Sequence, residues 1–153
     1  MELIGPERYR LDCTATKFTL SSAAGGTNFS RRLCVKGPKL YVVADRGAVV
    51  YVGITNQPLR ARLYLGWTAK GANGYRGYSL RHHLKRADLF VWLHPRHGRA
   101  HIRELKTIEA EVAYHVRRRK QWPKYQTEIH FYPSTAAHRR IARKIVDKVA
   151  QAR

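Results

Sequence analysis

The residues of this sequence best suited to chemistry are two tyrosines, an arginine and a glutamate. Tyr41 and Tyr51 lie in two apolar runs, residues 39–44 and 48–53, which are joined by a short turn containing glycine. This pattern predicts a β-hairpin. If the two runs pair symmetrically about the turn, Tyr41 lies directly opposite Tyr51, and both hydroxyls emerge on one face of the hairpin.

The two faces of this hairpin are expected to differ in character. Side chains alternate along a strand, so Val43 and Val49 are expected on the face of the two tyrosines. The opposite face is expected to be aliphatic, with Leu40, Val42, Ala44, Ala48, Val50 and Val52. In this arrangement two phenols project from an otherwise apolar ribbon.

A basic helix is predicted directly after the hairpin. Asn56 is the expected N-cap, and Pro58 suits the first turn of a helix that contains Arg60 and Arg62. Cations on a helix that starts beside a strand end and two phenols suit the binding of an anion such as phosphate.

The clearest helical periodicity runs from His101 to Arg119, where apolar residues recur on one stripe. Glu109 lies inside that stripe. A carboxylate among apolar side chains is unfavourable unless it is paired or binds a cation, which makes Glu109 a candidate metal ligand. A buried ion pair of Glu109 with Arg62 or another cation is the alternative. With ten acidic residues in the whole chain, the composition permits one divalent ion, Mg²⁺ or Mn²⁺, on a single carboxylate rather than a two-metal site.

Together these residues resemble the GIY-YIG nuclease family. Lys39-Leu40-Tyr41 is similar to its first motif without the glycine, and Tyr51-Val52-Gly53 is similar to its second. Arg62 falls where the family has a helix arginine, and Glu109 fits the pattern apolar-Glu-x-x-apolar-apolar of its metal-binding glutamate. Many members carry a basic or histidine side chain one turn after the arginine, where this chain has Gly66; Arg76, His82 or Lys70 could supply that role.

The resemblance implies a metal-dependent endonuclease that hydrolyses phosphodiester bonds. Tyr41 would take a proton from the attacking water, Tyr51 would orient that water, and Arg62 would stabilise the phosphate. Because an unperturbed tyrosine has a pKa of about 10, this role requires nearby cations to lower the pKa of Tyr41. The alternative for each tyrosine is a half-buried strand aromatic without a catalytic role.

The charge of the chain points to a polyanionic partner. Its 153 residues have a formal net charge of +20, which favours nucleic acid, with a membrane surface as the second interpretation. The stretch from Pro58 to Ala87 contains seven Lys or Arg and no acid. The cations predicted to contact nucleic acid there are Arg60, Lys70, Arg76, Arg81 and Lys85, interleaved with Trp67, Tyr75 and Tyr78 for base or sugar stacking.

Two further segments follow the long helix. Gln126 stands where the family often has a supporting asparagine, and with Glu128 and His130 it lies on one face of a strand predicted over residues 127–132. These three polar residues either support the site or form only a polar strand face. A basic amphipathic helix is predicted from Thr135 to about Ala150, with Ser134 as its cap.

The element order predicts an α+β fold with a small, mainly antiparallel sheet of about three core strands flanked by helices, as in the GIY-YIG family. Residues 39–153 would form the nuclease domain, and residues 1–38 an N-terminal extension packed on it. The chain has no apolar run of membrane-spanning length and no signal-peptide pattern, and its two cysteines lack metal-site spacing, so a cytoplasmic location is expected. DNA is the favoured substrate; a non-catalytic basic nucleic-acid-binding module and an RNA-directed nuclease are the alternatives, and the sequence gives no oligomeric state.

Overall fold

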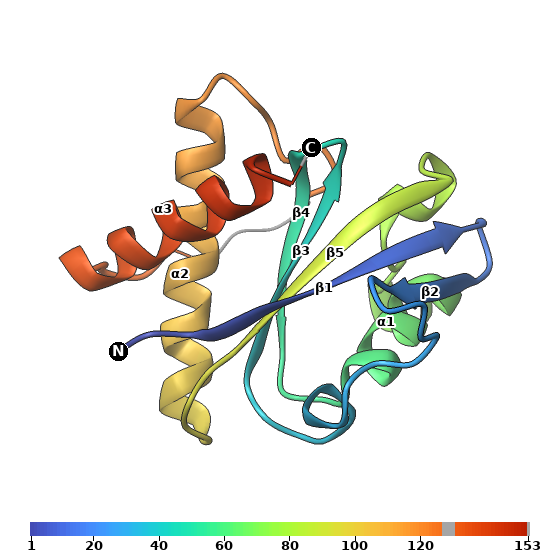
Figure 1. Ribbon diagram of the computed structural model, residues 1–153, viewed down its shortest axis with the longest axis horizontal. Coiled ribbons are helices and arrows are strands. Elements are labelled where there is room, and N and C mark those ends of the chain that lie inside the picture. The colour runs from blue at the N-terminus through green and yellow to red at the C-terminus, as the bar shows by residue number, and fades with distance from the viewer. Residues whose placement is uncertain (127–130, 153) are drawn as a thin grey trace.

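The computed structural model describes residues 1–126 and 131–152. In this part of the chain the fold is α+β, with one open antiparallel sheet of five strands in the order β2-β1-β5-β3-β4 and three α-helices (Figure 1). The strands are β1 (Ile4–Cys13), β2 (Phe18–Ser22), β3 (Lys39–Asp45), β4 (Ala48–Thr55) and β5 (Arg86–Leu93). The helices are α1 (Leu59–Thr68), α2 (Arg99–Arg118) and α3 (Ala136–Ala150), and short 3₁₀ turns lie at Arg31–Cys34, Ala72–Gly74 and Ser79–His82.

The expectation of about three core strands is wrong, because residues 1–38 contribute two strands to the same sheet. β1 pairs with β5 in antiparallel register, so that Tyr9 lies opposite Leu89 and Leu11 opposite Ala87. Burial alternates along β1, with Tyr9, Leu11 and Cys13 inside and charged residues between them. Alternation marks β1 as a half-buried strand, but its partner β5 is remote in the sequence. β3, which begins at Lys39, therefore shares its sheet with two strands of the predicted extension, residues 1–38.

The sheet separates two apolar cores, one on each face. On one face, α2 and α3 pack against the even-numbered residues of β3 and their neighbours (Figure 1): Leu40, Val42, Phe90 and Trp92 meet Leu105, Ile108, Val112, Ile141 and Ile145. On the other face, α1 and the loops around it cover Tyr9, Leu11, Tyr41 and Val91 with Leu59, Leu63, Trp67 and Tyr78. The candidate tyrosines belong to this second core.

The β3–β4 hairpin has a shorter turn than predicted, since Asp45 pairs with Ala48, and it also contains a bulge; each shifts the predicted pairing by one residue. Val43 pairs with Tyr51 and Tyr41 with Gly53, whereas the pairs nearer the turn follow a register shifted by one residue. The prediction that Tyr41 faces Tyr51 across the hairpin is therefore wrong. The extra residue of β4 is Val50, which a bulge leaves without its own partner.

The bulge also exchanges two neighbouring valines between the faces of the sheet. Val49 packs in the core under α2 and α3, and Val50 packs in the core under α1, the reverse of the expectation. One inserted residue has this effect because the side-chain period of a strand is two. Tyr41 and Tyr51 still share a face, because both lie beyond the bulge.

Lys39 holds the entrance and the exit of this hairpin together. Its side chain is fully buried at 0 % exposure. Its Nζ donates hydrogen bonds to the carbonyl oxygens of Val35 (2.7 Å), Gly37 (2.9 Å) and Gln57 (3.0 Å). Burial lowers the pKa of Lys39 to about 8. The lysine thus fixes the loop between β4 and α1, the helix that carries Arg60 and Arg62.

The predicted helix starts need small corrections. α1 begins at Leu59 with Pro58 at the N-cap position and, among the described residues, without a side-chain cap, so Asn56 is not the cap. Instead, the Asn56 carbonyl accepts a hydrogen bond of 2.9 Å from the Gly37 N–H. α3 is capped by Thr135 rather than Ser134, in a capping box with His138.

The remaining predicted elements agree with the structure in part. The segment Ser79–His82 forms a single 3₁₀ turn. The strand predicted over residues 127–132 lies mostly outside the described residues, and Phe131 and Tyr132 are not in a strand. Among the described helices, none has the length and apolar character needed to cross a bilayer.

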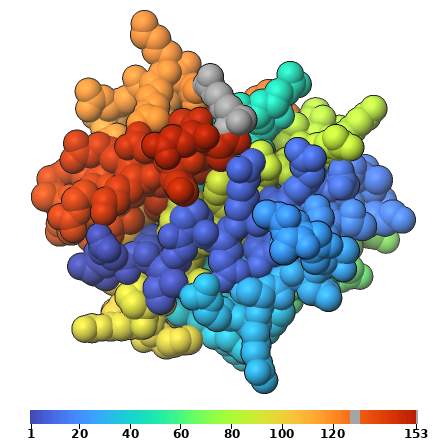
Figure 2. Space-filling model, in the orientation of Figure 1, coloured from blue at the N-terminus to red at the C-terminus, as the bar shows by residue number. Residues whose placement is uncertain are grey.

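α3 lies beside the N-terminal residues, as the space-filling view shows (Figure 2). Lys144 Nζ donates to Glu2 Oε1 at 3.0 Å, and Arg8 Nη2 donates to the Ala152 carbonyl at 3.1 Å. The two ends of the described chain are therefore joined by polar contacts at the protein surface.

Candidate functional site

Three tyrosines form an aromatic cluster on the α1 face of the sheet. The rings of Tyr41 and Tyr51 stack with centroids 6.0 Å apart, and Tyr78 meets Tyr51 edge-on at 5.1 Å. The Tyr41 and Tyr78 hydroxyls share a hydrogen bond of 2.7 Å. The sequence indicated Tyr78 only as a stacking residue of the loop after α1, but the structure makes it part of the same cluster.

Two glycines make room for these rings. A Cβ at Gly53 would lie 2.5 Å from the hydroxyl oxygen of Tyr41, and a Cβ at Gly66 would overlap the ring of Tyr78. The position one turn after Arg62 therefore has no side chain of its own because Tyr78 fills that space from the following loop. The glycine inside α1 was the sequence signal for this close approach.

Arg62 lies against this cluster with its guanidinium already oriented. Its Nη1 donates to the Tyr75 hydroxyl at 2.8 Å, and its Cζ lies 5.1 Å from the centroid of the Tyr78 ring. Burial alone lowers the pKa of Arg62, but the oxygens of Tyr41, Tyr78 and Tyr75 raise it by more, so the net pKa is above the ordinary value. Arg62 is thus a permanent cation held by ring contact and one hydrogen bond.

The pKa of each tyrosine in the cluster is raised, which corrects the expected depression for Tyr41. Tyr41 is fully buried, and burial raises its pKa most, with a further contribution from Tyr78; Arg62 acts in the opposite direction without offsetting them. Burial likewise raises the pKa of Tyr51 and of Tyr78. Tyr51, unlike Tyr41, keeps part of its surface accessible to solvent.

Glu109 lies on the buried side of α2, as its place in the apolar stripe predicts, and is 9 % exposed. It is close enough to Tyr51 for its charge to raise the pKa of that tyrosine, after the larger effects of burial and of Tyr41. Arg62 lowers the same pKa. Because β4 is an edge strand, Tyr51 at this edge lies within electrostatic reach of α1 on one face and of α2 on the other.

The segment after α2 borders this edge. The Tyr125 N–H donates to the Val50 carbonyl at 3.0 Å, and the Val52 N–H donates to the Gln126 Oε1 at 2.8 Å. Gln126 therefore continues the hydrogen bonding of β4 beside Tyr51. His130 and Glu128, the other predicted supporting residues, lie outside the described residues.

Four of the five cations predicted to contact nucleic acid are exposed: Arg60, Lys70, Arg76 and Lys85. The fifth, Arg81, is bound to the carboxyl end of α1, where its guanidinium donates to the carbonyls of Gly66, Trp67 and Ala69. A cation at this end of a helix satisfies carbonyls that lack intrahelical partners. The structure thus accounts for Arg81 as a capping residue.

Comparisons of the chain with protein-family models, with curated proteins and with solved structures gave no match. What the site can do is therefore inferred from its own groups. An oriented guanidinium suits a phosphate, a partly exposed phenol suits a water molecule, and a buried carboxylate suits a divalent cation.

Proposed function

We propose that this protein is a metal-dependent endonuclease that hydrolyses phosphodiester bonds in DNA. The main support is that Tyr51 lies within electrostatic reach of both Arg62 and Glu109, although the three residues come from β4, α1 and α2. A cation from α1, a phenol from β4 and a carboxylate from α2 are groups of the kind that phosphodiester hydrolysis requires. The resemblance of the sequence to GIY-YIG nuclease motifs favours the same reaction.

Arg62 would bind the non-bridging oxygens of the scissile phosphate. Its hydrogen bond to Tyr75 and its contact with the Tyr78 ring restrict the guanidinium before substrate arrives. A preoriented donor stabilises the charge that develops in the transition state without reorganising at that moment. Tyr75 is 42 % exposed, so its ring is also available for contact with a sugar or base.

Tyr51 would orient the attacking water, whose proton would pass through solvent to the leaving 3′ oxygen, and Tyr41 would position Tyr51. The basis for this assignment is that Tyr41 is fully buried with its hydroxyl on Tyr78, so water does not reach it in this conformation. Because burial raises the pKa of Tyr51, its phenol stays protonated near neutral pH and acts through hydrogen bonds. This role for Tyr41 replaces that of proton acceptor, which the family resemblance gave it.

Glu109 would hold the divalent ion. Mg²⁺ commonly takes one or two carboxylates from the protein and fills its shell with water and substrate phosphate, and a single buried carboxylate fits that donor set. Mg²⁺ or Mn²⁺, when bound, would stabilise negative charge on the leaving 3′ oxygen.

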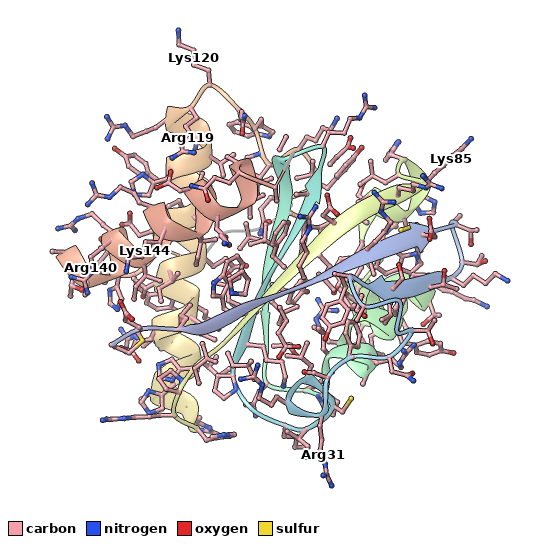
Figure 3. All side chains as sticks on the ribbon, viewed as in Figure 1. Arg31, Lys85, Arg119, Lys120, Arg140 and Lys144 are labelled. Carbon is pink, nitrogen blue, oxygen red and sulfur yellow. The ribbon has the colours of Figure 1, made fainter. Side chains whose placement is uncertain are left out.

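A basic groove offers a path for the nucleic acid to this edge of the sheet. It has a volume of about 1180 Å³ and is lined by Tyr125, which contacts β4, and by six cations: Arg8, Arg10, Arg46, Lys85, Arg86 and Lys124. Two acids, Asp45 and Asp88, also line it. Further cations lie elsewhere on the surface: Figure 3 shows Arg31 and Lys120 projecting outward on opposite sides of the molecule. This distribution suits a long polyanion better than a small ligand.

A non-catalytic nucleic-acid-binding module is the second candidate. The burial of Tyr41 and its raised pKa favour this candidate, because both oppose proton transfer by Tyr41. Neither feature would interfere with the binding of nucleic acid. An RNA-directed nuclease with the same residues is the third. The three candidates differ in whether a nucleic acid is cut, and which one.

The deciding experiment is cleavage of supercoiled plasmid with Mg²⁺ or Mn²⁺, beside an equal concentration of single-stranded RNA. We expect the wild type to nick the plasmid and Glu109→Gln to lose activity by at least about 100-fold, with DNA binding unchanged. Glu111→Gln is the matched control, because Glu111 lies on α2 beside His115, with a 3.9 Å contact between their side chains, and has no proposed role.

Circular dichroism of both variants would establish that they fold. Binding without cleavage of either nucleic acid would contradict the nuclease proposal and leave a binding module. Cleavage of RNA alone would identify the third candidate.

A further inference from the structure

Two histidines and a glutamate with no part in the proposed cleavage meet where β5 ends and α2 begins. His94 follows β5 directly, and His101 and Glu104 lie one turn apart near the start of α2. Nε2 of His94 is 2.8 Å from Oε2 of Glu104, and Nδ1 of His101 is 3.2 Å from the same oxygen. All three ligand atoms lie within 4.8 Å of one another. The sequence signal was the i, i+3 spacing of His101 and Glu104, which places them on one helix face.

The two separations from the Glu104 oxygen are close to those of a tetrahedral zinc site, and the two histidine nitrogens are at most 4.8 Å apart. Zinc bonds of about 2.0–2.1 Å place neighbouring ligand atoms roughly 3.3 Å apart. The two observed separations, 2.8 and 3.2 Å, need to open by only a few tenths of an ångström to admit an ion. The side chains of His101 and Glu104 are partly exposed, at 23 % and 34 %, which leaves them room to move.

His94 has the second contact that metal-binding histidines require. Its ring is 1 % exposed, and its Nδ1 lies 2.9 Å from the Arg96 N–H nitrogen and 3.0 Å from the Arg96 carbonyl oxygen. Nδ1 can therefore accept from the N–H when Nε2 carries the proton, or donate to the carbonyl when Nε2 binds an ion. A donor bond from the far ring nitrogen to a backbone carbonyl fixes the tautomer of a ligating histidine.

We propose that His94, His101 and Glu104 bind one Zn²⁺. Two imidazole nitrogens favour zinc and later first-row metals over Mg²⁺ or Ca²⁺, which prefer oxygen. Three protein ligands leave the fourth position to water, on the exposed side formed by His101 and Glu104. The ion links the end of β5 to the first turns of α2, the helix that also carries Glu109.

Isothermal titration of the full chain, stripped of metal with a chelator, with zinc chloride tests this proposal. We expect one zinc site per chain that excess Mg²⁺ does not block, with zinc affinity at least about 10-fold lower in His101→Ala and in Glu104→Gln. His97→Ala is the matched control, since His97 lies in the same loop and packs on Gly37, 2.8 Å from a Cβ built there. Its zinc affinity should equal that of the wild type. His101 and Glu104 are partly exposed, so these variants should fold, as circular dichroism would verify.

Cobalt substitution gives a second readout that does not depend on affinity. Co²⁺ bound to this site should show the intense visible absorption of four-coordinate cobalt, and His101→Ala should lose it. The chain contains eight histidines, so zinc binding by itself does not locate the site. Absence of zinc binding, or equal zinc affinity in the wild type and both ligand variants, would overturn the proposal.

Discussion

The substitution Gly66→Ala tests whether Tyr78 packs on the backbone of α1, the contact that completes the site around Arg62. A Cβ at residue 66 would overlap the Tyr78 ring, which is 3 % exposed. The ring is held from two sides, because its hydroxyl bonds to Tyr41 at 2.7 Å and its backbone N–H donates to the Gly66 carbonyl at 2.9 Å. The added methyl therefore has no free space to occupy.

Three effects set the size of the change. Alanine in place of glycine favours the helix by up to about 1 kcal/mol. Overpacking a filled core disfavours the native state by about 1–3 kcal/mol, and loss of the bond between the Tyr78 N–H and the Gly66 carbonyl disfavours it by about 1 kcal/mol more. The free energy of unfolding should therefore fall by about 1–3 kcal/mol in total, and Tm by about 2–4 °C for each kcal/mol.

Urea unfolding followed by far-ultraviolet circular dichroism measures this change, and Tyr78→Ala supplies the control background. Without the ring, Gly66→Ala should be neutral or should stabilise the protein by up to about 1 kcal/mol. Equal effects of Gly66→Ala in both backgrounds, or no loss of stability when Tyr78 is present, would refute the packing described here.

Three further substitutions test other parts of the framework by the same unfolding assay. Lys39→Met should lower the free energy of unfolding by about 1–3 kcal/mol, since three carbonyls lose their donor; an unchanged stability would contradict the role of this lysine. Arg81→Ala should lower it by about 1–2 kcal/mol yet leave DNA affinity nearly unchanged, whereas a large loss of affinity in a stable variant would show that Arg81 contacts DNA. Glu7→Gln should cost about 1–2 kcal/mol near neutral pH, because hydrogen bonds from Tyr9 and Arg32 help to offset the effect of burial, so that the pKa of Glu7 is lowered. Since the folded pKa lies below the unfolded value of 4.5, this difference should persist above that pH and shrink as the pH falls through the folded pKa; a difference that grows in acid would contradict it.

The sequence predicted local features of the site well. The shared face of Tyr41 and Tyr51 and the inward position of Glu109 follow from periods of 2 and 3.6 residues, and the structure has both. The pairing of the tyrosines failed because Asp45 joins the ladder opposite Ala48 and because the bulge at Val50 adds a second shift, and neither is marked in the apolar pattern of the hairpin. β4 contains both adjacent and alternating valines, and such an apolar run is compatible with more than one pairing register.

Features that depend on distant segments could not be predicted in the same way. β1 has a clear alternation, but nothing in residues 4–13 indicates that they pair with residues 86–93. The pKa of Tyr41 depends on how completely α1 and Tyr78 cover it, which a cation count does not reveal. Likewise, His94 meets His101 and Glu104 only because α2 turns back at the end of β5.

Single-turnover cleavage of a labelled DNA duplex, with protein in excess at saturating concentration, tests most directly whether Tyr51, Arg62 and Glu109 form one site. Saturation removes differences in binding, so the rate constant reports the chemical step. We expect Tyr51→Phe, Arg62→Lys and Glu109→Gln each to slow cleavage by at least about 10-fold, while Tyr64→Phe, at a tyrosine of α1 that is 62 % exposed, cuts at the wild-type rate. A wild-type rate in any of the three site variants, or no cleavage by the wild type at saturation, would contradict the proposed site.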